Sequence, residues 1–269
     1  YPASRWAPDV LLWLATYDYN VGNYEPAEKQ GVQVADKYHD SPLADSALLL
    51  AGQAAFKRKE YVRANDIFSR LAKEYPSSRR LAEARLMQAD ALSELGKYPA
   101  AILIYEEIVI KHKDSEWVPA AWCRKAECQL ALGTDDRKRY EEAIESYRVV
   151  ANSSAAGPEM VLQANCRIGR CLEKLERADE AFKQYYLKVI VPYLDERANG
   201  VWHTEACKLW FTRALLNAAD MKEAGKDWEG TVHILERGVD ADIPAANDIR
   251  ERIKKIKSEH WWNFINSSR

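Results

Sequence analysis

Tyrosine recurs at a fixed interval along this chain. Tyr24, Tyr61 and Tyr98 are each separated by 37 residues, and Tyr140 follows after a further 42. A period of this length is typical of proteins that stack one supersecondary unit several times. Because a single unit cannot bury its apolar face alone, neighbouring units must pack against one another. The sequence therefore predicts a stacked array.

Small and aromatic residues keep the same register as the tyrosines. An alanine stands three residues after each tyrosine, and from the second unit on an aromatic residue stands four residues after the alanine. In the fifth unit Ala178 replaces the tyrosine. The alanines are Ala27, Ala64, Ala101, Ala143 and Ala181, and the aromatic residues are Phe68, Tyr105, Tyr147 and Tyr185. Small residues on this grid predict close contact between backbones, with the aromatic rings filling the gaps.

The apolar pattern within each unit has helical rather than two-residue periodicity, as in "ALLLAGQAAFKRKEY" from Ala47 to Tyr61. The sequence predicts an all-α solenoid of about six antiparallel helix pairs. The first helices are expected to start near Arg5, Ser41, Arg79, Trp117, Pro158 and Thr204, and the second helices near Tyr24, Tyr61, Tyr98, Tyr140, Ala178 and Trp228. A capping helix at 244–262 is expected to bury Ile249, Ile253 and Ile256.

One solenoid domain is expected to span the chain from 1 to 269, with its joints marked by turn-forming residues. The predicted repeats are 1–40, 41–77, 78–115, 116–155, 156–200 and 201–242. Gly22, Gly96 and Gly133 are expected to end first helices, and Ser41 and Ser78 to cap the helices that follow. A break around "LDERANGVW", 194–202, is expected to change the array there.

The first residues, "YPAS", repeat the joint found at Tyr38 and Tyr75, again at a spacing of 37. We expect them to be the tail of a second helix. On that interpretation the chain was cut from a longer array or from a precursor.

The second unit resembles the tetratricopeptide repeat family. With Asp45 counted as position 1, it matches the family consensus at Ala47, Gly52, Ala54, Tyr61, Ala64, Phe68 and Pro76. The resemblance implies a right-handed superhelix and a protein-interaction scaffold without catalysis. The long period and the joints "YPSS" and "LAEA" resemble the bacterial cell-envelope branch, which includes outer-membrane-protein assembly lipoproteins and periplasmic cell-division coordinators.

By the same resemblance, consensus positions 5, 9 and 12 of the first helices face a concave groove. The predicted partner-binding residues are Tyr19, Gln53, Phe56, Asp90, Glu127 and Arg170. Tyr19 and Phe56 offer aromatic anchors, and Asp90 and Glu127 form an acidic middle. A peptide with apolar anchors and some basic character fits this floor. The groove lacks the lysine, asparagine and arginine pattern with which family members grip chaperone C-terminal carboxylates.

The cysteines could suggest a metal site, because Cys123 and Cys128 are five residues apart, as are Cys166 and Cys171. The repeat favours packing instead, since each cysteine takes the place of a small or apolar residue of the grid. Five cysteines without a pairing framework favour a reducing compartment, whereas the envelope-like joints favour a periplasmic or outer-membrane-associated location. The two observations leave both a periplasmic or outer-membrane-associated location and a cytoplasmic one as alternatives.

Composition and motifs narrow the function further. The net charge of -2 shows no excess of basic residues of the kind that nucleic-acid binding requires, and no apolar stretch is long enough for membrane insertion. No phosphate-binding loop or nucleophile motif is present, and no cofactor is expected. We predict a non-catalytic scaffold that binds a protein or peptide. The alternative is an interaction or regulatory module of a larger protein whose activity lies outside this chain.

The adjacent tryptophans near the end, Trp261 and Trp262, cannot both face one groove of a helix. We expect one to pack on the sixth repeat and the other to be left for a partner, or both to close the end of the array.

Overall fold

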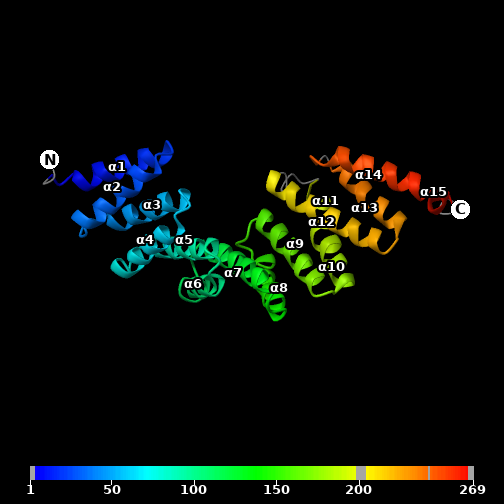
Figure 1. The fold of residues 1–269 in the computed structure, drawn as a ribbon, viewed down its shortest axis with the longest axis horizontal. Coiled ribbons are helices and arrows are strands. Elements are labelled where there is room, and N and C mark those ends of the chain that lie inside the picture. Colours follow the sequence, from blue (N-terminus) through cyan, green and yellow to red (C-terminus); the bar gives the residue numbers. More distant parts are fainter. Residues whose placement is uncertain (1–3, 198–203, 242, 266–269) are drawn as a thin grey trace. The chain divides into compact units, whose positions relative to one another are not determined.

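The protein is all-helical in the part of the chain described by the computed structural model, residues 4–197, 204–241 and 243–265 (Figure 1). This confirms the predicted fold class. The helices form two compact units, Tyr1–Leu132 and Gly133–Arg269. The boundary divides the predicted fourth repeat, 116–155, whose first helix belongs to unit 1 and whose second helix belongs to unit 2. That one solenoid spans 1–269 stays a prediction.

Unit 1 consists of helix pairs followed by one further helix. The helices are α1 (Ala7–Asn20), α2 (Tyr24–Lys37), α3 (Ala44–Lys57), α4 (Tyr61–Glu74), α5 (Leu81–Glu94), α6 (Tyr98–Lys111) and α7 (Val118–Leu132). Each helix packs on the next one along the chain, and the first helices of successive pairs, α1, α3, α5 and α7, also contact one another. The short connections make the neighbours antiparallel.

Unit 2 follows the same plan with helices of more varied length, from 5 residues in α15 to 20 in α12. Its helices are α8 (Lys138–Ala151), α9 (Pro158–Lys174), α10 (Ala178–Tyr185), α11 (Val191–Arg197), α12 (Glu205–Ala224), α13 (Trp228–Asp240), α14 (Ala246–Glu259) and α15 (Trp261–Ile265). A π-helical segment, η1 (Tyr186–Ile190), joins α10 to α11. Helix α9 packs against α8, α10 and α12, and α13 lies between α12 and α14.

The alanine grid forms the core, as predicted. Ala64, Ala101, Ala143 and Ala181 have no exposed surface. The glycines of the grid allow still closer contact, because a Cβ atom at Gly52 would lie 2.4 Å from the ring of Phe68. This distance is well inside van der Waals contact, so the ring occupies the space that a side chain would need.

The connections after α1, α3 and α5 contain a left-handed backbone residue, whereas Gly133 after α7 does not take that conformation. Gly22 and Gly96 follow α1 and α5 with φ angles of 88° and 71°, as expected of glycines that end helices. Lys59 takes the same place after α3 with a φ angle of 62°, although its side chain disfavours that conformation.

The serines at the joints do not cap the helices as predicted. Ser41 Oγ accepts a hydrogen bond from the backbone N–H of Leu43 at 3.3 Å, and Ser78 Oγ accepts one from that of Arg80 at 2.9 Å. Helices α3 and α5 begin only after those residues, and neither has a side-chain cap. The serines therefore stabilise the turn that precedes each helix.

The capping helix is in two parts. Helix α14 buries Ile249, Ile253 and Ile256 as predicted, but it ends at Glu259, and α15 starts at Trp261. His260 at the break stacks on Trp228, with ring centroids 3.6 Å apart, and both adjacent tryptophans are more than half exposed. Trp262 lies edge-on against His260, with ring centroids 5.6 Å apart, and the expectation that one of the two packs on the sixth repeat stays a prediction.

Some predictions fall outside the described residues. The opening "YPA" lies in 1–3, and most of the predicted break at 194–202 lies in 198–203. None of the helices in the described residues is both long and apolar enough to span a bilayer.

Candidate functional site

The structure gathers three of the predicted partner-binding residues around one small cavity in unit 1. Phe56 of α3, Asp90 of α5 and Glu127 of α7 line a space of about 130 Å³. They project from three consecutive first helices, as the repeat register predicts. The remaining lining residues are Ser93, Glu94, Tyr105 and Arg124.

Asp90 is the buried polar centre of this cavity, with 6% of its surface exposed. Its Oδ1 accepts a hydrogen bond from the Tyr105 hydroxyl at 2.7 Å, and its Oδ2 accepts one from the Arg124 guanidinium. Burial raises the pKa of Asp90 above its ordinary value and outweighs the opposing effect of Arg124. Burial and the neighbouring carboxylate also raise the pKa of Tyr105, so its hydroxyl remains a donor.

These contacts revise the predicted acidic middle of the groove. The Arg124 guanidinium pairs with Asp90, which therefore contributes little net negative charge to the cavity. Glu94 and Glu127 remain as further carboxylates in the lining, and Arg124 is the cation of the same lining. The aromatic wall is held in place, since the Phe56 ring packs edge-on against Tyr61 with centroids 5.1 Å apart.

The other predicted residues are not part of this cavity. Tyr19 packs edge-on against Tyr24, with centroids 5.4 Å apart. Gln53 Nε2 donates to Glu83 Oε1 at 3.2 Å. Arg170 belongs to unit 2 and forms an ion pair with Glu173 at 2.9 Å.

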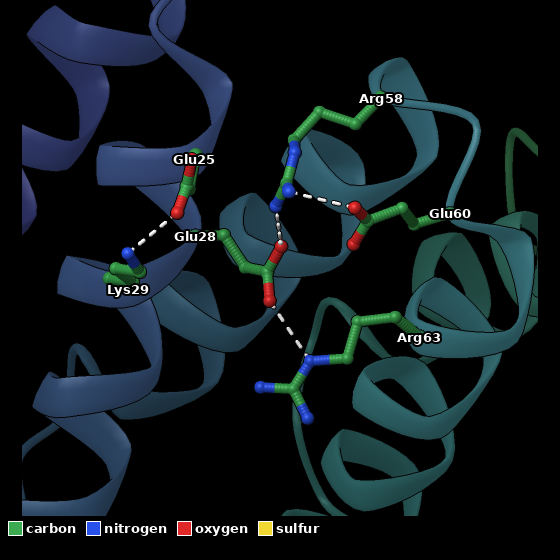
Figure 2. Close-up of polar contacts among 6 residues, drawn as sticks. All are labelled: Glu25, Glu28, Lys29, Arg58, Glu60 and Arg63. Atoms are coloured by element: carbon green, nitrogen blue, oxygen red, sulfur yellow. Dashed lines mark hydrogen bonds and ion pairs between the residues drawn. The ribbon is translucent and has the colours of Figure 1, made fainter.

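A buried carboxylate at the joint of the first two repeats escaped the sequence analysis. Glu28 of α2 is buried and forms ion pairs with Arg58, at the end of α3, and Arg63, on α4, each at 2.9 Å (Figure 2). Arg58 also pairs with Glu60 at 2.7 Å. A signal was present, because the residues at the same register of two later repeats, Ile102 and Ile144, are apolar and buried.

The cysteines pack as the repeat predicted. All five are free and buried, and burial raises the pKa of Cys128 to about 11 and that of Cys166 to about 12. Such thiols stay protonated near neutral pH and are poor nucleophiles and poor metal ligands. Within the described residues, histidine, cysteine and acidic side chains form no group of three or more that could hold a metal ion.

Comparison with family models identifies the repeat. Tetratricopeptide repeat models match residues 46–78 and 86–161, which include the α3–α4 pair and the cavity residues of α5 and α7. These two segments are similar to tetratricopeptide repeats. The repeats are typical of protein-interaction scaffolds rather than of enzymes. A comparison with curated protein sequences gave no match.

Several solved structures share the fold. A tetratricopeptide repeat protein from Parabacteroides merdae is 12% identical with a TM-score of 0.57, and the match covers 93% of this chain and 98% of that one. BtubC (BKLC) from P. vanneervenii is 15% identical with a TM-score of 0.56, covering 88% and 92%. A putative kinesin light chain from Podosopora anserina is 16% identical with a TM-score of 0.52, covering 65% and 90%. At these identities the likeness concerns the fold.

Proposed function

We propose that this protein is a non-catalytic scaffold that binds a peptide segment of a partner protein through the first helices of unit 1. The observation that carries the proposal is the cavity between Phe56, Asp90 and Glu127. Three successive repeats contribute to it, so a chain lying across these helices would contact all three at once.

The charges around the cavity favour a basic side chain in the bound peptide. The lining holds three carboxylates, Asp90, Glu94 and Glu127, against the one guanidinium of Arg124, so its net charge favours a lysine or arginine. The space of about 130 Å³ suits one side chain rather than a folded ligand. The ring of Phe56 can cover the aliphatic part of that side chain or add a cation–π contact.

Peptide binding can be measured on an immobilised library in which one position is lysine, arginine, alanine or glutamate. We expect lysine or arginine to be selected. Replacing both Glu94 and Glu127 by glutamine should weaken binding of a selected peptide about tenfold, in line with the loss of partly exposed ion pairs. Glu116→Gln is the matched control, because Glu116 is an exposed carboxylate of unit 1 outside the cavity lining.

Two results would refute the proposed site. One is a set of selected peptides without a basic preference, and the other is a double variant that binds as tightly as the unmodified chain. Phe56→Ala should weaken binding of the same peptide even at high salt, because its contribution does not depend on charge.

We also propose a bacterial cell-envelope location, which is supported by the long repeat period and by the joint sequences "YPSS" at 75–78 and "LAEA" at 81–84. Fractionation of the cells that produce the protein tests it. Recovery with the periplasmic or outer-membrane fraction supports the envelope branch, and recovery with the cytosol contradicts it.

A further inference from the structure

Helix α1 carries an exposed apolar stripe along one face. Trp6, just before the helix, Trp13 and Tyr17 are 57%, 65% and 56% exposed. Val10 and Val21 continue the stripe and are also more than half exposed. Trp13 and Tyr17 stack on each other with centroids 6.0 Å apart, so the stripe has an ordered surface. A continuous patch of this kind marks an interaction surface.

The next repeat shows what the same face normally contacts. The residues of α3 that correspond to Val10, Leu14 and Tyr17, each 37 positions on, are alanines without exposed surface: Ala47, Ala51 and Ala54. Helix α2 packs on α3 so closely that a Cβ atom at Gly31 would lie 2.6 Å from the carbonyl oxygen of Ala47 and 3.0 Å from the Cβ of Ala51. The alanines make that approach possible.

The larger side chains on α1 exclude such a close approach. Val10, Leu14 and Tyr17 would keep a neighbouring helix farther from the α1 backbone than α2 is from α3. The stripe therefore suits a neighbouring helix whose large side chains lie between those of the stripe.

We propose that this occupant is a second copy of the chain, with the two α1 helices antiparallel. The stripe positions 6, 10, 13, 14, 17 and 21 have the same spacing when read from either end. A two-fold axis at the middle of the stripe therefore sets Trp6 opposite Val21, Tyr17 opposite Val10, and Trp13 opposite Leu14. Each large ring meets a smaller side chain, as an isologous interface requires.

A hollow beside Val10 offers room for the ring opposite it. The hollow has a volume of about 400 Å³ and lies between the start of α1 and the end of α2, with Trp6, Leu11 and Tyr38 in its lining. Tyr17 of the second copy, placed opposite Val10, can insert its ring there.

The area of the stripe sets the strength of this dimer. An aromatic side chain can bury about 150–250 Å², and about half of that remains exposed at each of the three rings. With the two valines, the two copies together would bury on the order of 800–1,000 Å², below the roughly 1,200 Å² of standard specific interfaces. We therefore expect dissociation in the micromolar range or weaker.

Sedimentation equilibrium across a concentration series tests the dimer. The unmodified chain should shift from monomer to dimer with rising concentration. Trp13→Glu, which places a charge at the centre of the interface in both copies, should raise the dissociation constant at least about tenfold. Leu103→Glu on α6, where the leucine is 67% exposed, is the matched control and should leave it unchanged.

Cross-linking tests the orientation. A mixture of chains carrying Val10→Cys with chains carrying Tyr17→Cys should form a mixed disulfide faster than either variant alone. The native thiols are all buried and compete little. A chain that stays monomeric, a dimer unaffected by Trp13→Glu, or equal cross-linking of Val10→Cys with itself would each overturn the proposal. Glutamine at Glu94 and Glu127 should not alter the dimer, so the outcome is independent of peptide binding in the cavity.

Discussion

Replacing Gly52 by alanine tests the packing rule on which the fold depends. Gly52 lies inside α3, and a Cβ atom there would meet three atoms of the Phe68 ring at 2.4–2.7 Å. Carbon atoms in favourable contact are about 3.5–4.0 Å apart. The ring would therefore have to move by about 1 Å, and it has no exposed surface.

Two opposing terms decide the change in the free energy of unfolding. Alanine is a better helix former than glycine by about 1 kcal/mol. Overpacking a filled core costs about 1–3 kcal/mol, and this site belongs to the upper half of that range because the obstructing atoms are a buried ring. We expect Gly52→Ala to lower the free energy of unfolding by about 1–2 kcal/mol. The corresponding fall in the midpoint temperature is about 3–6 °C.

Urea unfolding followed by circular dichroism gives the measurement, with Gly225→Ala as the control. Gly225 follows α12 with a φ angle of -79°, and a Cβ atom there would be at least 3.4 Å from its neighbours. The same substitution should therefore raise the free energy of unfolding at this site, by about 0.4–1 kcal/mol. The two glycines should respond with opposite signs.

A second substitution locates the cause of the loss. Phe68→Leu replaces the ring by a smaller aliphatic side chain, so adding it to Gly52→Ala should cost less than the sum of the two single changes. If Gly52→Ala stabilises the protein as Gly225→Ala does, or if the two changes at Gly52 and Phe68 simply add, the close approach is not what the grid requires.

Three further predictions concern backbone, thiols and the cavity. Lys59→Gly should stabilise the chain by about 0.5–1 kcal/mol in thermal unfolding, and Gly96→Ala should destabilise it by about 1 kcal/mol, because both positions have positive φ and a Cβ atom at Gly96 would meet no neighbour. Cys128 and Cys166 should resist a thiol-specific dye at pH 8 in the folded protein and react once it is unfolded, whereas rapid labelling of the folded chain would contradict their raised pKa values. Burial raises the pKa of Asp90, so the folded state binds the proton of this carboxyl more tightly than the unfolded state does. The resulting contribution to stability is largest below the unfolded pKa. It is lost as the pH rises through the folded pKa. Asp90→Asn should remove that part of the pH dependence, and a parallel pH profile for the two proteins would contradict it.

The sequence predicted the helices well where the small-residue grid determines them. Helices α4, α6, α9 and α13 start at the predicted residues Tyr61, Tyr98, Pro158 and Trp228. Each start is fixed by the spacing to residues that pack against a neighbouring helix, and such spacing is visible in one sequence. The start predicted at Ser41 was early, because a serine can hydrogen-bond within a turn as readily as it can cap a helix.

The π-helical segment η1 could not be predicted in this way. A single turn with a wider hydrogen-bond pattern leaves the apolar periodicity nearly unchanged, so Tyr186–Ile190 looks like ordinary helix in the sequence. Its effect appears only in three dimensions. Val189 and Ile190 are fully buried, and Tyr193 beyond them stacks on Phe211 of α12 with centroids 4.2 Å apart.

The groove was harder to predict than the helices, because one position of the repeat can serve either a partner or the core. Asp90 stands at a groove-facing position, yet the Tyr105 hydroxyl and Arg124 both bind it. The ion pairs of Glu28 likewise join residues 30 and 35 positions apart, a separation at which the sequence of one repeat carries no pairing signal.

In three repeats, those of Phe68, Tyr105 and Tyr185, the aromatic residue decides which of these roles the groove position takes. A buried tyrosine hydroxyl needs a hydrogen-bond partner, and a buried phenylalanine needs none. Tyr105 binds Asp90, and Tyr185 donates to Glu173 at 2.5 Å, so each tyrosine engages a carboxylate of its own first helix. Phe68 makes no such demand, and Gln53 in the same repeat is left to bond Glu83 on α5. Asp90 and Glu173 are therefore core partners first, and their charge is available to a ligand only in part.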